Sequence, residues 1–182
     1  MLKVFVFSIV LLFIQSCQSN SDLIVIETDL GSFTIEVDFH SAPKHSANFV
    51  KLVNEGFYDG LTIYRIIGGT LIQGGESHTI ELKSTIDSNN SQKYSLDNEF
   101  GLKNIRGAVG ASYTLNQGNS QGISDGSQFY ICLANLPIWD GKYTVFGKVV
   151  ENIYVVDKIS WAPMDLYNTP NNPIYIKRAY LK

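Results

Sequence analysis

The sequence predicts a mainly β fold, a closed eight-stranded antiparallel β-barrel capped by two α-helices. Short apolar runs rich in β-branched and aromatic residues recur along the chain, glycine-containing turns separate them, and two segments have helical spacing. The length of 182 residues suits one folded domain, and 45% hydrophobic with 17% charged residues argues against disorder. A formal net charge of −3 supplies no phosphate-neutralising surface, so no nucleic-acid partner is expected.

The start of the chain differs from the rest. Lys3 precedes the apolar run Val4–Ile14, which is shorter than the roughly 20 residues that span a bilayer core, and this pattern predicts a signal peptide over residues 1–16. The Ile-Gln-Ser-Cys motif that ends at Cys17 is similar to a bacterial lipobox. It implies lipidation of Cys17, a tether over residues 17–22, and an exported, membrane-anchored lipoprotein facing the periplasm or cell exterior. The alternatives are an uncleaved anchor, a buried strand, or simple secretion with cleavage near Ser16.

The folded part opens with a hairpin. Leu23–Thr28 is apolar and β-branched, Asp29-Leu30-Gly31 is typical of a turn, and Ser32–Val37 alternates. The polar stretches 77–98 and 113–125 are predicted to be long surface loops, which often carry function. Six further strands are predicted at Thr62–Ile67, Leu71–Gln73, Ala108–Ser112, Gln128–Leu133, Tyr143–Val150 and Ile174–Leu181.

Two segments have the spacing of helices. The first opens at Pro43, which suits a first helical position, with Ser41 near the N-cap and Gly56 as a stop. The second spans Glu151–Ile159. The apolar stripe of the first helix is predicted to contain Ala47, Phe49, Val50, Leu52 and Val53.

The side chains that bind metals or act as nucleophiles are sparse. Of the two cysteines, Cys132 lies in an apolar run that predicts a buried, inert thiol, and a lipid on Cys17 would prevent a disulfide between them. No Cys or His spacing is typical of a metal site, so neither a metal nor another cofactor is expected. The remaining ionisable candidates are predicted to be solvated histidines and scattered, unpaired carboxylates: His40, His45 and His78, and Asp38, Glu76 and Glu99.

Seven short motifs follow one another along the chain: APKHSANF at 42–49, GFYDG at 56–60, IYRII at 63–67, LIQGGE at 71–76, LDNEF at 96–100, GSQFYI at 126–131 and DGKYTVFGKV at 140–149. Each alone is a weak signal. Together, in this order and spacing, they resemble the cyclophilin-type peptidyl-prolyl cis/trans isomerases over nearly all of residues 23–182.

The resemblance implies one isomerase domain over residues 23–182. Such a protein accelerates rotation of X–Pro bonds, here in exported proteins whose folding it assists, and acts as a monomer on proline-containing polypeptides without a cofactor. The alternative is a cyclophilin-fold module that binds proline-containing segments with little or no catalytic turnover.

The chemistry explains which side chains such a site needs. Amide resonance gives the peptide bond a rotation barrier of roughly 18–20 kcal/mol. A donor aimed at the nitrogen of the twisted amide, where conjugation is lost, stabilises that state selectively. The resemblance places its catalytic arginine at Arg65 and implies Gln73 and Gln128 as polar anchors; packing or structural hydrogen bonds are the alternative for each. The other substrate-binding positions that it implies are Ile63, Leu71, Ser112, Tyr130, Trp139 and Tyr143.

Several positions depart from the family pattern near the site. Tyr64 replaces its histidine, Ile63 and Thr70 replace aromatic residues, Trp139 replaces a leucine, and Tyr113 stands where a backbone-binding asparagine is usual. The loss of an aromatic wall at Thr70 removes apolar contact worth roughly 1–3 kcal/mol, which Trp139 could restore from another side. The sequence therefore leaves the residual activity and any sensitivity to cyclosporin open.

Overall fold

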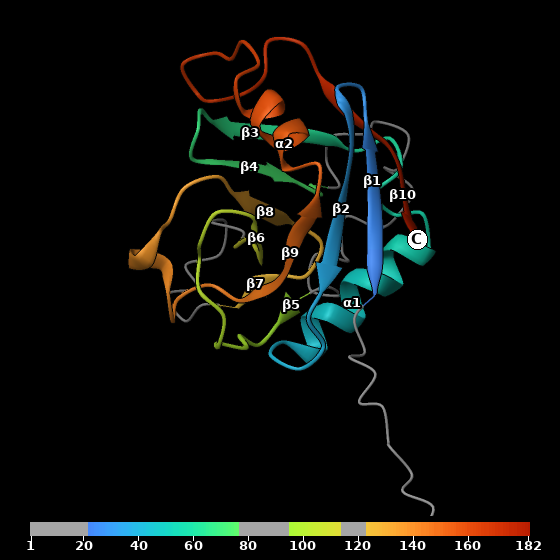
Figure 1. The fold of residues 1–182 in the computed structure, drawn as a ribbon, viewed down its shortest axis with the longest axis vertical. Helices are drawn as coiled ribbons and strands as arrows, with labels where there is room; N and C mark the ends of the chain where they lie inside the picture. Colours follow the sequence, from blue (N-terminus) through green and yellow to red (C-terminus); the bar gives the residue numbers. More distant parts are fainter. Residues whose placement is uncertain (1–21, 77–94, 114–122) are drawn as a thin grey trace, which may run out of the picture.

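The computed structural model describes residues 22–76, 95–113 and 123–182. Its barrel strands are β1 (Leu23–Thr28), β2 (Gly31–Val37), β3 (Thr62–Ile67), β4 (Leu71–Gly74), β6 (Ala108–Ala111), β8 (Phe129–Cys132), β9 (Val145–Glu151) and β10 (Ile174–Leu181). They close in the order β1-β10-β3-β4-β8-β6-β9-β2, and every neighbouring pair is antiparallel (Figure 1). The predicted closed eight-stranded antiparallel barrel is therefore confirmed.

Two helices cover the barrel at different ends. Helix α1 (Pro43–Asn54) lies at the lower end of the view in Figure 1, and α2 (Ile153–Ser160) lies at the upper end. A short 3-10 turn, Pro137–Trp139, precedes β9. Among the described residues, no helix combines the length and apolar character that a membrane span requires.

Helix α1 starts at Pro43 and stops before Gly56, which has a φ of +64°, as the sequence predicts. Its buried face is different from the predicted stripe, since Ala47 is exposed and Val50 only half-buried. Ser41 hydrogen-bonds to Asp38 instead of capping the helix. Counted from His45, four buried side chains follow i, i+4, i+7 and i+8 spacing, and Ser46 is buried next to the first of them. The buried side chains of α1 are His45, Ser46, Phe49, Leu52 and Val53.

The second helix begins two residues later than predicted. Strand β9 continues to Glu151, because that residue still pairs with Thr34 of β2. Asn152, with a φ of +59°, then turns the chain into α2. The strand therefore takes the residues that helical spacing alone assigned to the helix.

The predicted surface loops are described only at their ends. There, β5 (Ser95–Leu96) and β7 (Ser124–Asp125) pair as a small antiparallel sheet, which the sequence pattern did not predict. The remaining parts of both loops, with His78, lie outside the described residues, as do residues 1–21 with the predicted signal peptide, Cys17 and most of the tether.

Strand alternation divides the apolar side chains into two clusters. Phe129 and Ile131 of β8 belong to the main core inside the barrel. Tyr130 and Cys132, which alternate with them along β8, point to the outer face. They form a smaller cluster with Ala108 and Val145. Cys132 is fully buried, and burial, with the charge of Asp140, raises its pKa to about 12. The prediction that this thiol is buried is confirmed, and the raised pKa favours the unreactive protonated form.

Candidate functional site

A β-bulge in strand β3 directs two consecutive side chains to the outer face. Ile63 pairs with Gly74 and Arg65 pairs with Gln73, so Tyr64 is an extra residue on one side of the ladder. Alternation is interrupted here: Ile63 and Ile66 both join the interior core, although they are three residues apart. Tyr64 and Arg65 therefore both lie on the outer side, as a bulge permits.

Arg65 is the first member of a row that crosses four strands. The pairing register places it opposite Gln73 of β4, Gln73 opposite Tyr130 of β8, and Tyr130 opposite Gly110 of β6. Directly opposite residues in a sheet share one face. The structure thus brings Arg65, Gln73 and Tyr130, which the sequence analysis selected, onto one surface.

The polar half of this surface is a chain of hydrogen bonds. Arg65 Nη1 donates to Gln73 Oε1 at 2.7 Å, and Gln73 Nε2 donates to Ser112 Oγ at 2.9 Å. Gln73 is 7% exposed and Ser112 is also buried, whereas Arg65 is half-buried. A guanidinium has five N–H donors, so one bond to Gln73 fixes its direction and leaves donors to spare.

Gln128 belongs to a second polar chain beside the first. Its Oε1 accepts a hydrogen bond from the Tyr64 hydroxyl at 2.9 Å, and its Nε2 donates to Asp125 Oδ2 at 3.1 Å. The backbone N–H of Ser112 donates to the carbonyl oxygen of Gln128, which links the two chains. Burial, with the charge of Glu76, raises the pKa of Tyr64, so its hydroxyl stays protonated as a donor.

The other half of the surface is aromatic. The Trp139 ring lies 5.2 Å from that of Tyr130 and 4.6 Å from that of Tyr143, and the Tyr113 ring lies 4.5 Å from that of Tyr143. Tyr130 can lie flat across β6 because Gly110 has no side chain; a Cβ there would meet the Tyr130 ring at 2.2 Å. Trp139 and Tyr143 are half-buried, so they leave apolar ring surface accessible.

Two predicted substrate contacts are placed differently. Ile63 is 1% exposed and packs in the interior core, because the bulge separates its direction from that of Arg65. The prediction that it contacts substrate is therefore wrong. Leu71 of β4 pairs with Cys132 of β8. Its side chain faces the outer side of the barrel but is almost fully buried.

Two of the departures from the family pattern have visible structural roles. The Tyr113 hydroxyl donates to the carbonyl oxygen of Lys142, so this side chain joins the aromatic half instead of presenting an amide. The Thr70 hydroxyl donates to the carbonyl oxygen of Gly68 at 3.4 Å within the β3–β4 turn, a bond that an aromatic hydrocarbon ring could not make.

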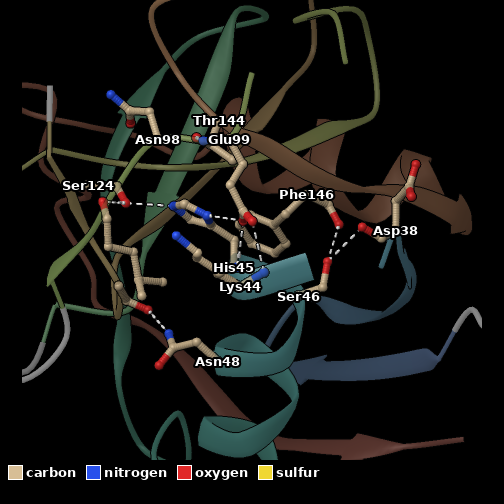
Figure 2. A network of polar contacts seen from close by, with 12 residues as sticks. Asp38, Lys44, His45, Ser46, Asn48, Asn98, Glu99, Ser124, Thr144 and Phe146 are labelled. Atoms are coloured by element: carbon tan, nitrogen blue, oxygen red, sulfur yellow. Dashed lines mark hydrogen bonds and ion pairs between the residues drawn. The ribbon is translucent and has the colours of Figure 1, made fainter. Parts of the chain in front are cut away.

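A third polar cluster lies at the start of α1, and it was not predicted. His45 Nδ1 is 2.7 Å from Glu99 Oε2, and His45 Nε2 is 2.7 Å from Ser124 Oγ (Figure 2). Glu99 also accepts the backbone N–H groups of Lys44 and His45, at 3.0 Å each, and so caps the helix from a distant segment. The prediction of a solvated His45 is wrong, and Glu99, for which residue spacing indicated no acid/base partner, pairs with it; His40 is exposed as predicted.

This cluster has the order of a Ser-His-Glu relay but not its accessibility. His45 is 2% exposed and Ser124 is 1% exposed, and Ser124 Oγ also lies 3.1 Å from the Leu96 carbonyl oxygen. Burial lowers the pKa of His45, although Glu99 has the opposite effect on it. The lowered pKa favours a neutral ring. A buried serine whose hydroxyl is engaged cannot reach a substrate, so the cluster is structural.

The outer-face surface combines the two properties that prolyl rotation needs. A fixed cationic donor lies beside aromatic rings that can hold a proline ring, and Ser112 and Gln73 offer polar groups for the flanking peptide. Among the described residues, no group of three or more His, Cys, Asp or Glu side chains could hold a metal ion.

The comparison with protein families decides the identity. Residues 23–181 match the family model described as cyclophilin type peptidyl-prolyl cis-trans isomerase/CLD. The chain belongs to the cyclophilin-type peptidyl-prolyl cis-trans isomerases. It is therefore an isomerase, and Tyr64, Thr70 and Trp139 are variations within a cyclophilin.

Individual relatives agree with this assignment. The chain is 34% identical to peptidyl-prolyl cis-trans isomerase-like 1 of Neurospora crassa, over 86% of this cyclophilin and 91% of that protein. It is 36% identical to peptidyl-prolyl cis-trans isomerase A of Dickeya dadantii, over 88% and 85% of the two chains. A crystal structure of a cyclophilin type isomerase from Cryptosporidium parvum superposes with a TM-score of 0.75 at 26% identity, covering 89% of this chain and 98% of that one.

Proposed function

We propose that this cyclophilin accelerates X–Pro rotation in exported proteins through Arg65 and assists their folding. One observation supports Arg65 above all: its guanidinium is half-buried and held by Gln73 at 2.7 Å on the outer face, next to the aromatic cluster. As the amide twists, its nitrogen recovers a lone pair, and an aimed guanidinium N–H stabilises that state more than the planar ground state. No covalent bond breaks.

The remaining side chains hold the substrate. The Trp139 and Tyr143 rings offer apolar surface to the proline ring, and Tyr130 packs against both of them. Leu71 of β4, which faces the same side as Cys132, is the further apolar residue that we assign to this surface. Gln73, Ser112 and Gln128 bind the backbone groups that flank the proline, and each is already oriented by another hydrogen bond. A structure of the Cryptosporidium parvum protein was determined in the presence of the dipeptide Ala-Pro, which supports a proline-containing segment as the ligand.

The test uses the fragment that starts at Asn20, which keeps every barrel strand because the barrel closes within Leu23–Leu181. We expect it to accelerate cis/trans exchange of a short Xaa-Pro peptide, measured by exchange NMR. Arg65→Ala should reduce kcat/KM at least ~100-fold, since it removes the donor to the twisted amide. Arg178→Ala, an exposed arginine on β10, is the matched control and should retain the parent rate.

Two results would contradict this assignment. Equal rates for the parent and Arg65→Ala would show that the guanidinium is not the catalytic donor. Peptide binding by the parent without acceleration would favour the alternative, a module that binds proline-containing segments without useful turnover.

We also propose that Cys17 carries a lipid and that the isomerase acts as a monomer tethered to a membrane outside the cytoplasm. The support is the apolar run Val4–Ile14 followed by a lipobox-like motif that ends at this cysteine. Cys17→Ser should leave the precursor unprocessed and without incorporated palmitate on metabolic labelling. A variant that is processed and labelled like the parent would rule the lipid anchor out.

A further inference from the structure

Three large apolar side chains stand out in the segment between α2 and β10. Trp161 is 70% exposed, Leu166 is 99% exposed and Tyr167 is 84% exposed. We call these three residues the apolar ledge. Single exposed apolar residues are ordinary on protein surfaces, whereas several in one short segment indicate an interaction surface.

The backbone around the ledge is fixed by hydrogen bonds. Asp165 and Asn168 close a turn through the bond from Asn168 N to Asp165 O, and the Asp165 carboxylate accepts the backbone N–H groups of Tyr167 and Thr169. At the base of the turn, Met164 and Pro170 form an isolated bridge. Leu166 and Tyr167 are therefore held outward by an ordered turn, so a partner meets them without first ordering the loop.

The ledge is attached to the strand that carries Arg65. Ile66, the next residue, donates its backbone N–H to the carbonyl oxygen of Asn168 at 2.8 Å. Trp161 covers the β3–β4 turn: a Cβ added at Gly68 or Gly69 would lie 3.3 Å or 3.0 Å from its indole ring. The ledge thus flanks β3 and the turn on the side of Arg65 away from Gln73, and the turn leads directly into Thr70.

The position of the ledge favours a polypeptide partner over a bilayer. In Figure 1 the segment between α2 and β10 lies at the upper end of the barrel, whereas β1 starts at the lower end. Ile66 directly follows Arg65 and is hydrogen-bonded to Asn168, the residue after Tyr167, so a polypeptide bound across Arg65 would reach the ledge without leaving the surface.

We propose that the apolar ledge binds a large apolar side chain next to the proline in the substrate, and so determines which X–Pro bonds this isomerase prefers. The inference rests on the proposed function, because it extends the surface that contains Arg65. Trp161, the residue that follows α2, supplies aromatic surface against Gly68 and Gly69, which directly precede Thr70, the position where the sequence lacks the family's aromatic residue. The expected substrates are therefore unfolded polypeptides, because they expose apolar residues next to proline.

The test compares peptide pairs that differ in one side chain. Exchange NMR gives kcat/KM for Ala-Phe-Pro-Ala against Ala-Ser-Pro-Ala, and for Ala-Ala-Pro-Phe against Ala-Ala-Pro-Ser, with the fragment from Asn20. We expect the parent to prefer the phenylalanine peptide of at least one pair by about five- to tenfold, as burial of part of an aromatic ring would give. Trp161→Ala and the double change Leu166→Ser with Tyr167→Ser should bring that ratio close to one.

Tyr154→Ala is the matched control, because Tyr154 is a 65% exposed aromatic residue on α2 outside the ledge. It should keep the parent's ratio. No preference in the parent, or the same preference in the ledge variants, would overturn the proposal. If the parent catalyses no peptide at all, the proposed function fails, and the Kd ratio of the same pairs, measured by titration, then decides the ledge separately. Binding of the parent to phosphatidylethanolamine and phosphatidylglycerol vesicles that is lost in the ledge variants, without a peptide preference, would assign the ledge to a membrane instead.

Discussion

The cluster around His45 and the cluster around Arg65 are built from similar hydrogen bonds but differ in what they leave available. In the first, His45, Glu99 and Ser124 lie within 2.7 Å of their partners and the ring is 2% exposed. In the second, Arg65 is half-buried, and one bond, to Gln73, engages its guanidinium among the described residues. A satisfied, buried network stabilises a fold, whereas a partly exposed donor can bind a substrate.

The largest effect that would break this comparison is the loss of His45. We expect His45→Ala to lower the free energy of unfolding by about 3 kcal/mol, because Glu99 and Ser124 both lose a buried hydrogen-bond partner. Urea unfolding followed by circular dichroism measures it. His40→Ala, at an exposed position of the same segment, should change stability by less than about 0.5 kcal/mol. Similar losses for the two variants would mean that the buried network contributes little.

A smaller effect is expected on the outer-face surface that contains Arg65, where the hydroxyl of Tyr64 orients Gln128. Tyr64→Phe removes the hydroxyl that donates to Gln128 Oε1, so the bond from Gln128 Nε2 to Asp125 is left to orient the amide. We expect KM for an Xaa-Pro peptide to rise about three- to tenfold, the value of one hydrogen bond, with a smaller change in kcat.

Tyr180→Phe is the control for that change, because its hydroxyl donates to Glu27 at 3.1 Å between β10 and β1, away from Arg65. It should leave both kinetic constants at the parent value. A KM for Tyr64→Phe equal to that of the parent would show that Gln128 needs no orientation to bind substrate.

The smallest expected effect is the pH dependence of folding stability, which depends on the buried His45 cluster and not on Arg65. Burial lowers the pKa of His45 below its ordinary 6.5, against the effect of Glu99. Burial would raise the pKa of Glu99, but hydrogen bonds from His45 and Lys44 lower it below 4.5. Both shifts mean that the unfolded chain binds more protons. Stability should therefore be complete above pH 6.5 and fall as the pH drops through the lowered pKa of His45, with a further loss from Glu99 below pH 4.5.

Melting temperatures between pH 8 and pH 4 test this expectation. The parent should lose stability on acidification, and His45→Ala should lose less between pH 7 and pH 5. A parent whose melting temperature rises as the pH falls through this range would contradict the direction of the His45 shift.

Local patterns in the sequence predicted most of the fold. Alternation in Ser32–Val37, the apolar runs and Pro43 at a helix start are properties of neighbouring residues, and the barrel confirms them. The β5–β7 pair was missed because two-residue strands have no periodicity to detect. Glu151 was assigned to a helix because its pairing with Thr34 depends on a strand far away in the sequence.

The site was predicted only in part, because local motifs identify residues but not the pairing between strands. Motif positions identified Arg65, Gln73 and Ser112, which the structure connects by hydrogen bonds. The misplacement of Ile63 and the role of Tyr64 both follow from a bulge, and register is set between strands, not within one. The pairing of His45 with Glu99 joins residues 54 positions apart, and no local pattern points to it, because the first turn of α1 contains no acidic residue.

The extra residue in β3 separates the closure of the barrel from the hydrogen bonds of its outer face. Deleting Tyr64 would remove the bulge and restore strict alternation, with Ile63 inside, Arg65 outside and Ile66 inside, and Arg65 would stay opposite Gln73. The deletion would also remove the hydroxyl that donates to Gln128 Oε1. A strand shortened by this one residue should therefore still close the barrel, and the loss should appear in how Gln128 is held.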